Sequence, residues 1–230
     1  MPVFQLADQL LFPPPHLAEP DGLLAVGGDL TPPRLLLAYS SGIFPWFNEG
    51  DPLLWWSPDP RFILEPTAIH VSRSLDKVIR RGSFQLTIDR AFAEVMLACG
   101  PDRQEDTGTW ITDGMLAAYG RLYKMGFAHS VECWQGDELV GGLYGVCLGR
   151  CFFGESMFHR QSNASKVAMV FLARRLAAYH FDMIDCQLPT SHLASLGGRG
   201  ISRTTYLSRL RQAGVVPTAT PSPAPFPSEG

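Results

Sequence analysis

The chain has 230 residues, of which 46% are hydrophobic and 18% are charged, a composition typical of a packed globular protein that excludes a largely disordered one. No apolar run is long enough to span a bilayer, and the opening MPVFQLADQLLFPPP lacks the basic start and long apolar centre of a signal peptide, so we expect a cytoplasmic protein. The net charge of −3 does not indicate nucleic-acid binding by the chain as a whole.

Residues 1–62 are expected to form a small N-terminal α/β domain that is rich in Pro and Gly. Thr31 followed by Pro32 is typical of a helix start, and Gly42 is typical of a helix end. The next stretch, GIFPWFNEGDPLLWWSPDPR at 42–61, combines four Pro with five Phe or Trp residues. Because each Pro removes a backbone donor and fixes φ, we expect neither a regular helix nor a central strand in this stretch.

Residues 63–214 alternate between predicted helices and strands. The helix HVSRSLDKVIRRG is expected to end at Gly82, and it is followed by the strand FQLTID and the helix AFAEVMLACG. Thr112 is placed to cap the next amphipathic helix. AHSVECWQ and ELVGGLYGV are predicted strands joined by a turn at Gly136-Asp137, and CFFGESMF is a third strand.

The remaining elements complete an α+β pattern of mixed α/β layers. Ser162 or Asn163 opens the long helix ASKVAMVFLARRLAAYHF, which is followed by the short buried strand MIDCQL and the helix SRTTYLSRLRQAG. This order predicts helices packed on a sheet, and it resembles the fold of the N-acetyltransferase (GNAT) superfamily. The Pro-rich tail, residues 215–230, is expected to be a disordered extension.

The sequence does not indicate a coenzyme A or zinc site. Acetyltransferases that use coenzyme A usually carry Q/R-x-x-G-x-G/A, whose amides bind the pyrophosphate, and this spacing is absent here. The five cysteines include no C-x-x-C pair, and their spacings do not provide the grouped ligands that zinc requires. We therefore expect no cofactor, no metal, and reduced thiols that are mostly buried.

Asp185 and Gln187 lie two residues apart in MIDCQL, and so on one face of the predicted strand. An acid and an amide in a buried apolar strand need partners, because unpaired burial is costly. They form either a structural pair that satisfies a nearby loop or a hydrogen-bonded couple that faces a reacting amine. In the second case Gln187 orients the amine, and Asp185 polarises Gln187 or balances a developing ammonium. Cys186 should point to the opposite side, which argues against a thiolate pair with His192.

Glu155, in GESMF, is flanked by apolar and aromatic residues, so we expect it in a cleft where a carboxylate would favour a cationic ligand. Leu143 and Phe152 on neighbouring strands, with Met169 and Leu172 at i, i+3 on the long helix, could line a pocket for a medium-sized apolar side chain. Ordinary core packing is the alternative explanation for these four residues.

Four cations gather on the helix that ends at Gly82. Arg73, Lys77 and Arg80 recur at i, i+4 and i+7, and Arg81 lies beside them. They form either a solvated helix face or a patch that binds phosphates, and in the second case binding would depend on salt concentration.

A series of ordered blocks extends through most of the chain: EPDGLLAVGGDLTPPRLLLAYSSGIFPWF, DPLLWWSPDPR, GTWIT, AHSVECW, LVGGLYGV, FFGESMF, NASK, IDCQ and HLASLG. Together these blocks resemble the leucyl/phenylalanyl-tRNA–protein transferase family. The resemblance implies an enzyme that moves Leu or Phe, and less readily Met, from its tRNA to a protein with N-terminal Arg or Lys. The product would be marked for N-end-rule degradation. It also implies an acetyltransferase-like catalytic domain with an additional N-terminal domain, and no cofactor.

The resemblance further implies roles for individual residues. The 3′-terminal adenosine of the tRNA would stack on Trp46 and Trp110, close to Glu155, and each stacked base contributes about 1–3 kcal/mol. Trp55 and Trp56 would anchor the aromatic loop, although a single satellite core of all these aromatics is the alternative. The other implied sets are the amine-orienting pair Asp185 and Gln187, the side-chain pocket Leu143, Phe152, Met169, Leu172 and Ile184, and the acceptor-stem patch Arg73, Lys77, Arg80 and Arg81.

The mechanism implied by the resemblance is direct transfer. The aminoacyl ester is already activated, so the neutral α-amine of the acceptor can attack its carbonyl without a covalent enzyme intermediate. We expect a monomer whose partners are aminoacyl-tRNA and the acceptor protein. Two alternatives from other classes are a coenzyme A-dependent N-acyltransferase and a non-catalytic RNA-binding module.

Overall fold

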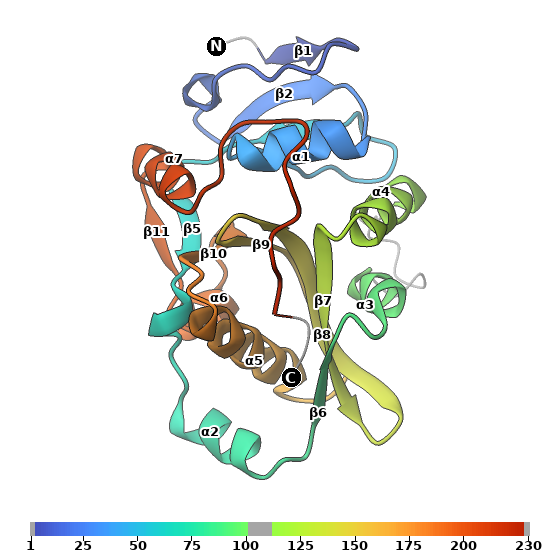
Figure 1. Ribbon diagram of the computed structural model, residues 1–230, viewed down its shortest axis with the longest axis vertical. Coiled ribbons are helices and arrows are strands. Elements are labelled where there is room, and N and C mark those ends of the chain that lie inside the picture. Colours follow the sequence, from blue (N-terminus) through green and yellow to red (C-terminus); the bar gives the residue numbers. More distant parts are fainter. Residues whose placement is uncertain (1–2, 101–111, 228–230) are drawn as a thin grey trace.

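The chain folds into two β-sheets with helices packed around them (Figure 1). The computed structural model describes residues 3–100 and 112–227. Within these residues the small sheet has the strand order β1-β2-β4-β3, and the large sheet has the order β11-β5-β10-β9-β8-β7-β6. The predicted mixed α/β layers are confirmed, whereas the acetyltransferase likeness and the boundaries at 62/63 and 214/215 stay predictions. None of the described helices combines the length and the apolar character needed to cross a membrane.

The small sheet contains a strand where the sequence analysis expects none. Its elements are β1 Phe4–Leu6, η1 Pro15–Leu17, β2 Leu23–Gly27, α1 Pro32–Ser40, β3 Phe44–Pro45 and β4 Leu54–Trp56. β4 lies between β2 and β3, so the expectation that no central strand occurs in residues 42–61 was wrong. The three residues of β4 lie between Pro52 and Pro58 and include no Pro, so their backbone donors remain free to pair.

The large sheet is antiparallel in the described residues except for one pair of neighbouring strands, β9 and β10. A turn at Gly136, where φ is +61°, joins β7 and β8 as the sequence predicts. The strands of this sheet are β5 Arg61–Leu64, β6 Gln85–Ile88, β7 Ala128–Gln135, β8 Glu138–Leu148, β9 Cys151–His159, β10 Met183–Gln187 and β11 Arg199–Ile201.

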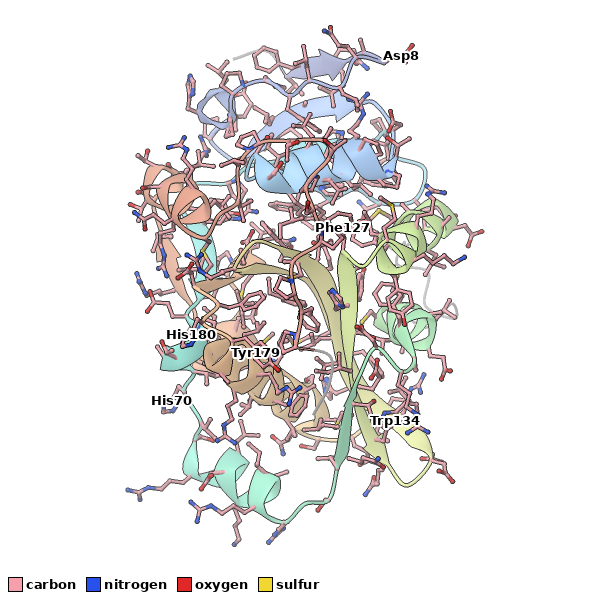
Figure 2. All side chains as sticks on the ribbon, in the orientation of Figure 1. Asp8, His70, Phe127, Trp134, Tyr179 and His180 are labelled. Atoms are coloured by element: carbon pink, nitrogen blue, oxygen red, sulfur yellow. The ribbon has the colours of Figure 1, made fainter. Side chains whose placement is uncertain are left out.

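Helices cover both faces of the large sheet. α5 packs against one face, in an apolar cluster with Leu143 and Phe152. α3 and α4 pack against the other face, and the cluster there continues into α1 and the small sheet, with Phe127 among the side chains that fill the interior (Figure 2). The helices of this part are η2 Pro66–Ala68, α2 Arg73–Arg80, α3 Phe92–Cys99, α4 Asp113–Lys124, α5 Ala164–Ala178, α6 Ser191–Ser195 and α7 Arg203–Gln212.

Side-chain caps fix where several of these helices begin. The hydroxyl of Thr112 accepts a hydrogen bond from Met115 N at 3.2 Å, as the sequence predicts. Thr190 caps the short helix α6 in the same way, through Leu193 N at 3.1 Å. Because α6 directly follows β10, this cap also sets the direction in which the chain leaves the sheet.

β9 and β10 run side by side for only three residues each. Cys151 to Phe153 pair with Met183 to Asp185, and beyond these residues the two strands separate. β9 continues beside β8 as far as His159. β10 instead stays with β5, and a bulge between Asp185 and Gln187 brings Gln187 opposite Phe62. Beyond these three residue pairs, β9 and β10 no longer pair with each other, although they are neighbours in the middle of the sheet.

The C-terminal tail has no helix or strand between residues 215 and 227, and residues in that range contact the rest of the protein. The disorder expected for residues 215–230 stays a prediction. The Ser40 hydroxyl and the backbone of Thr218 exchange hydrogen bonds of 3.1 and 3.0 Å. Further along, the Phe226 ring stacks on His129, with ring centroids 4.0 Å apart and planes at 12°. One aromatic ring and a pair of hydrogen bonds thus connect residues 218–226 to the rest of the fold.

Candidate functional site

A cleft of about 400 Å³ lies where β9 and β10 separate. Its lining combines apolar side chains with polar groups from β9, β10, α5 and α6. The apolar lining residues are Leu143, Met157, Met169, Ile184, Leu188 and Leu193, and the polar ones are Tyr144, Glu155, Ser156, His159, Ser165, Cys186, Gln187, Thr190 and His192. Such a mixture suits a ligand with an apolar side chain and a polar reacting group.

Three of the five residues expected in an apolar pocket line this cleft, namely Leu143, Met169 and Ile184. Phe152 and Leu172 do not line it, although both are fully buried in the same apolar cluster. The Phe152 ring instead packs near Gly145 and lies 5.7 Å from the Phe226 ring.

The presence of Met157 in the lining follows from an irregularity in the strand pairing. The β8–β9 ladder shifts register between Tyr144 and Gly145, so the alternation of side chains along β9 changes. Phe153 and Phe158 consequently share one apolar cluster although they are five residues apart. Met157 faces the cleft, a position that the sequence analysis did not assign to it.

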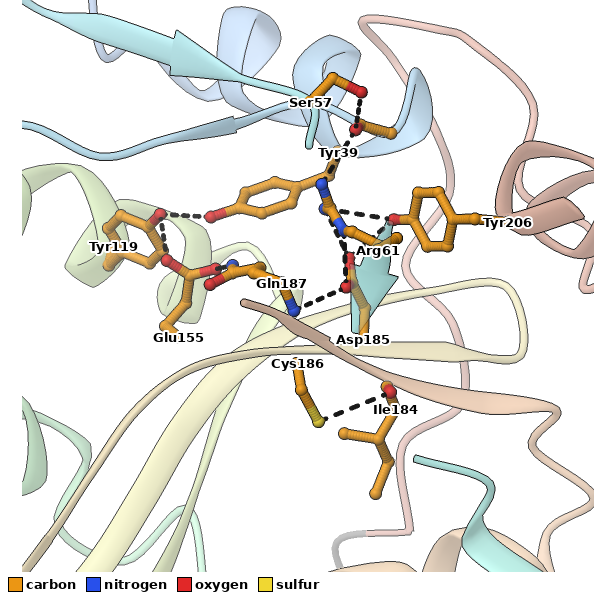
Figure 3. Close-up of polar contacts among 11 residues, drawn as sticks. Tyr39, Ser57, Arg61, Tyr119, Glu155, Ile184, Asp185, Cys186, Gln187 and Tyr206 are labelled. Atoms are coloured by element: carbon orange, nitrogen blue, oxygen red, sulfur yellow. Dashed lines mark hydrogen bonds and ion pairs between the residues drawn. The ribbon is translucent and has the colours of Figure 1, made fainter. Parts of the chain in front are cut away.

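Asp185 is fully buried and does not line the cleft. Its Oδ1 accepts hydrogen bonds from Arg61 Nε at 2.8 Å and from the backbone N–H of Gln187 at 2.9 Å. Its Oδ2 accepts from Arg61 Nη2 at 2.7 Å and from the Tyr206 hydroxyl at 2.6 Å. Figure 3 shows this arrangement, with Asp185 and Gln187 on the same side of β10. Only Gln187 of the pair therefore reaches the cleft.

Arg61 is the partner that makes burial of Asp185 possible, and it is only 1% exposed. Its guanidinium lies between the rings of Phe44 and Tyr206, 4.6 Å from each ring centroid. Burial by itself would lower the pKa of Arg61, but the neighbouring Asp185 carboxylate raises it above its ordinary value. Arg61 thus carries a permanent positive charge opposite Asp185.

Glu155 lies in the cleft, half-buried, at the point where β9 leaves β10. Its Oε1 accepts a hydrogen bond from Gln187 Nε2 at 2.8 Å, and its Oε2 accepts one from the Tyr119 hydroxyl at 2.8 Å. The Tyr119 hydroxyl also contacts that of Tyr39, so a hydrogen-bonded chain extends behind the carboxylate (Figure 3). Burial raises the pKa of Glu155 to about 7, and hydrogen bonds to the carboxylate limit the rise.

Gln187 presents one free polar atom to a ligand. Its Nε2 donates to Glu155, and its Oε1 has no hydrogen-bond partner among the residues that the structure describes. The backbone of Gln187 has a φ of +62°, which is uncommon for a residue other than Gly, and its N–H is fixed by Asp185. An amine that enters the cleft could therefore donate a hydrogen bond to this held amide oxygen.

The thiol of Cys186 is not arranged for nucleophilic attack. It lies on the opposite side of β10 from Asp185 and Gln187, as the sequence predicts (Figure 3). Burial raises its pKa well above that of an ordinary thiol. This arrangement argues against Cys186 as a nucleophile.

The aromatic loop exposes one indole and buries another. Trp46 is 43% exposed, and its backbone oxygen accepts a hydrogen bond from Trp56 Nε1 at 2.7 Å. Trp55 is fully buried and donates from Nε1 to Gly27 O at 2.8 Å. Because Trp46 is exposed, these aromatics do not all belong to one buried satellite core. Trp110, the other indole expected to bind the adenosine, lies outside the described residues.

The predicted cationic face on α2 is present at the surface. Arg73, Lys77, Arg80 and Arg81 are all exposed and surround a shallow hollow. One carboxylate, that of Asp76, shares the hollow and pairs with Arg80 at 2.6 Å. The face keeps a net positive charge, and it lies outside the cleft.

The sequence analysis missed Arg61 and the three tyrosines that hold the two carboxylates. Arg61 opens the apolar strand RFIL, and a cation in such a strand needs a buried partner. The sequence therefore indicates that Arg61 has a buried partner. It does not indicate that this partner is Asp185, 124 residues away. Tyr119 lies on the apolar face of α4 with Met115, so its pattern is that of a core residue.

Comparison with known proteins identifies one family for most of this chain. Residues 63–211 match the family described as leucyl/phenylalanyl-tRNA protein transferase, and residues 28–59 match the N-terminal domain of the same family. The solved structure of L-PGS from Bacillus licheniformis is 10% identical with a TM-score of 0.42, covering 59% of this chain and 48% of that one, and this similarity is too low to support any argument.

Relatives bearing the name of this transferase match almost the whole chain. One from Syntrophotalea carbinolica is 57% identical over 229 residues, which cover 99% of this chain and 100% of the relative. Another, from Nitrosospira multiformis, is 59% identical over 209 residues, or 90% of each chain. The chain therefore belongs to the leucyl/phenylalanyl-tRNA–protein transferase family.

Proposed function

We propose that this enzyme transfers Leu or Phe, and less readily Met, from aminoacyl-tRNA to the α-amino group of proteins that begin with Arg or Lys. The observation that carries this proposal is the cleft between β9 and β10, where an apolar lining meets Glu155 and Gln187. The product would carry a bulky apolar first residue, which marks it for N-end-rule degradation.

The apolar part of the cleft would receive the side chain of the transferred amino acid. Leu143, Met169 and Ile184 line it, and Met157 adds a flexible side chain that can adapt to different shapes. Apolar pockets distinguish substrates by only about 1–3 kcal/mol per methylene. This lining is therefore suited to accept Leu, Phe and Met instead of a single amino acid.

The RNA part of the substrate would use two surfaces outside the cleft. The exposed ring of Trp46 can stack on the terminal adenosine, together with Trp110, and stacking contributes about 1–3 kcal/mol per base. The cations Arg73, Lys77, Arg80 and Arg81 of α2 would hold the acceptor stem by its phosphates, without reading its sequence.

The chemical step would be direct attack of the acceptor amine on the aminoacyl ester. Gln187 Oε1 accepts a hydrogen bond from that amine. The Asp185 carboxylate accepts a hydrogen bond from the backbone N–H of Gln187 and so holds that backbone in place. Asp185 therefore acts as a fixed anion that positions Gln187. Correct placement of two reactants can supply roughly 7–11 kcal/mol in favourable cases. Because aminoacyl-tRNA is a cytoplasmic molecule, the enzyme is assigned to the cytoplasm, where it would act as a monomer.

The proposal is tested by incubating the protein with tRNA that carries labelled Leu and with a peptide that begins with Arg. We expect label in the peptide, none with a matched peptide that begins with Asp, and none when the tRNA is uncharged. Binding of the charged tRNA without transfer would instead favour the RNA-binding module. Tight binding of acetyl-coenzyme A in calorimetry, without tRNA-dependent transfer, would favour the N-acyltransferase.

A further inference from the structure

Two carboxylates, those of Asp185 and Glu155, lie beside Gln187, and they differ in how many of their hydrogen-bond acceptor positions remain free. The Asp185 carboxylate accepts four hydrogen bonds, two on each oxygen. A carboxylate offers about four acceptor positions, so Asp185 has none left for a proton from a substrate. It is also fully buried and paired with the permanent charge of Arg61. Asp185 is therefore excluded as the group that receives the proton of the attacking amine.

Glu155 retains the capacity that Asp185 lacks. One bond from Gln187 reaches its Oε1, one from Tyr119 reaches its Oε2, and the Tyr39 hydroxyl also contacts the carboxylate, which leaves one of about four acceptor positions on a residue that lines the cleft. It also contacts the amide that would hold the acceptor amine, so a proton has only a short distance to move. Other ionisable groups of the lining are placed differently: Cys186 is on the far side of β10, His159 is the last residue of β9, and His192 lies on α6.

We propose that Glu155 is a catalytic residue that carries a proton from the attacking amine to the ribose oxygen of the departing tRNA. This inference rests on the transfer reaction proposed above. The amine nitrogen forms the new bond to the carbonyl carbon, and the ester bond between that carbon and the ribose oxygen breaks. The proton lost by the nitrogen moves to Glu155, and from there to the ribose oxygen. Glu155 returns to its starting state, and no other reactant is required.

Tyr119 and Tyr39 serve this step as positioning residues. Burial raises the pKa of both hydroxyls well above the ordinary value, so both remain protonated donors at neutral pH. The Tyr119 hydroxyl holds Oε2 of Glu155, and Tyr39 from α1 lies against Tyr119. The α1 helix of the small sheet thereby contributes to the orientation of a carboxylate on the large sheet.

The surroundings of Glu155 bring its pKa close to neutral pH, where a group that carries protons is most effective. Burial raises its pKa to about 7, and general acid–base groups are most effective when their pKa lies near the working pH. The groups that face it are Tyr39 on α1, Tyr119 on α4, Tyr144 on β8, and Asp185 and Gln187 on β10. Asp185 raises the pKa of Glu155 further, whereas hydrogen bonds from the neighbouring donors lower it.

The test is the pH profile of single-turnover transfer at saturating Leu-tRNA, measured with two Arg-starting peptides whose α-amines differ in pKa. We expect one inflection near pH 7 that is the same for both peptides, and a second that follows the peptide amine. In Glu155→Gln the shared inflection should disappear, and the maximal rate should fall by roughly 10²–10⁴-fold. In Tyr119→Phe the carboxylate loses a donor, so the shared inflection should move to higher pH.

Three further variants make the result decisive. Glu138→Gln, on the exposed start of β8, removes a carboxylate far from the cleft and should change neither the rate nor the profile. Glu155→Asp keeps an ionisable group and should retain the shared inflection with a reduced rate, which also covers the case in which Glu155→Gln does not fold. Gln187→Ala removes the amide that orients the amine and should lower the rate without removing the inflection.

Specific outcomes would overturn the inference. If Glu155→Gln raises KM for Leu-tRNA with an unchanged maximal rate and profile, Glu155 serves only to bind the adenosine end. If its rate falls but the shared inflection stays, the titrating group is another one. If the wild-type protein shows no transfer at all, the proposed function itself is wrong, so the two failures are distinguishable.

Discussion

At the scale of single residues, the site depends on how two acidic side chains divide their hydrogen bonds. Asp185 has every acceptor position filled from within the fold, which makes it a fixed part of the structure. Glu155 has only part of its positions filled, and it faces the cleft. Identical carboxylate chemistry therefore supports two different roles, because the neighbours differ.

Breaking the buried Arg61–Asp185 pair should destabilise the protein strongly. Arg61→Met leaves the Asp185 carboxylate buried without its cation, which typically costs about 3–5 kcal/mol of unfolding free energy. Arg199→Met, which removes an exposed partner of Glu65, should cost less than about 1 kcal/mol. Urea unfolding of both variants measures the difference, and equal costs would contradict the importance assigned to the buried pair.

Glu155 should also make the protein less stable as pH rises, which is the opposite of the usual contribution of a carboxylate. Its pKa is raised from the usual 4.5 to about 7 in the folded protein, so the folded state binds the proton more tightly than the unfolded chain does. The stabilisation is complete below pH 4.5 and is lost as pH rises through about 7, by roughly 3 kcal/mol in total. Glu155→Gln should lack this decline in urea titrations across that range. Parallel curves for the two proteins would contradict the raised pKa.

At the scale of secondary structure, periodicity and capping signals predicted most of the helices and strands in residues 63–214. The hairpin of β7 and β8, the strand β10, the helix α5 and the Thr112 cap could all be predicted from the sequence. The short strands β2, β4 and β11 could not, because three to five residues between Pro and Gly carry too little pattern.

The candidate site was predictable in its residue types but not in its geometry. Alternation along MIDCQL placed Asp185 and Gln187 on one side of the strand, as Figure 3 shows. It could not show that only Gln187 reaches the cleft, because this depends on the separation of β9 from β10 and on a distant Arg. Bulges in both strand pairs have no local sequence signal here, and they decide the lining of the cleft.

The α2 helix gives a prediction about salt dependence. Lys77→Ala and Arg73→Ala should each weaken binding of tRNA similarly for all sequences, and each should reduce the slope of log affinity against log salt concentration by about 0.7–0.9. Asp76→Asn, which releases Arg80 from its ion pair, is the matched control on the same helix and should not weaken binding. Filter binding at several salt concentrations measures the slopes, and unchanged slopes in both Ala variants would exclude α2 as the phosphate-binding surface.

At the scale of the whole molecule, a chain of hydrogen-bonded side chains connects the site to the helix that packs beside the small sheet. Tyr39 comes from α1 beside the small sheet, Tyr119 from α4, and Glu155 from the large sheet, yet their polar atoms form one chain (Figure 3). The tail adds a second connection, since Thr218 bonds to Ser40 of α1 and Phe226 rests on β7 of the large sheet. The N-terminal part is therefore connected to Glu155 of the cleft by hydrogen bonds and to the large sheet by the tail.

The tail should contribute to stability without contributing to the chemistry. Phe226→Ala removes a ring that stacks on His129 and packs on the core, and it should lower the unfolding free energy by at least about 1 kcal/mol, because aromatic pairs contribute about 0.5–1.5 kcal/mol beyond their buried area. Phe226→Tyr keeps the stack and should behave like the wild type in the same thermal unfolding experiment. A large loss of transfer activity in the folded Phe226→Ala protein would show that the tail acts on the cleft.

The central claim is that an aminoacyl ester sits between β9 and β10, with its side chain in the apolar lining and its carbonyl beside Glu155 and Gln187. The most direct measurement is a crystal structure with an adenosine that carries Phe through a stable 3′-amide. We expect the Phe ring against Leu143, Met169 and Ile184, and the adenine on Trp46. Binding of the compound away from β10, or with its side chain outside this lining, would contradict the claim.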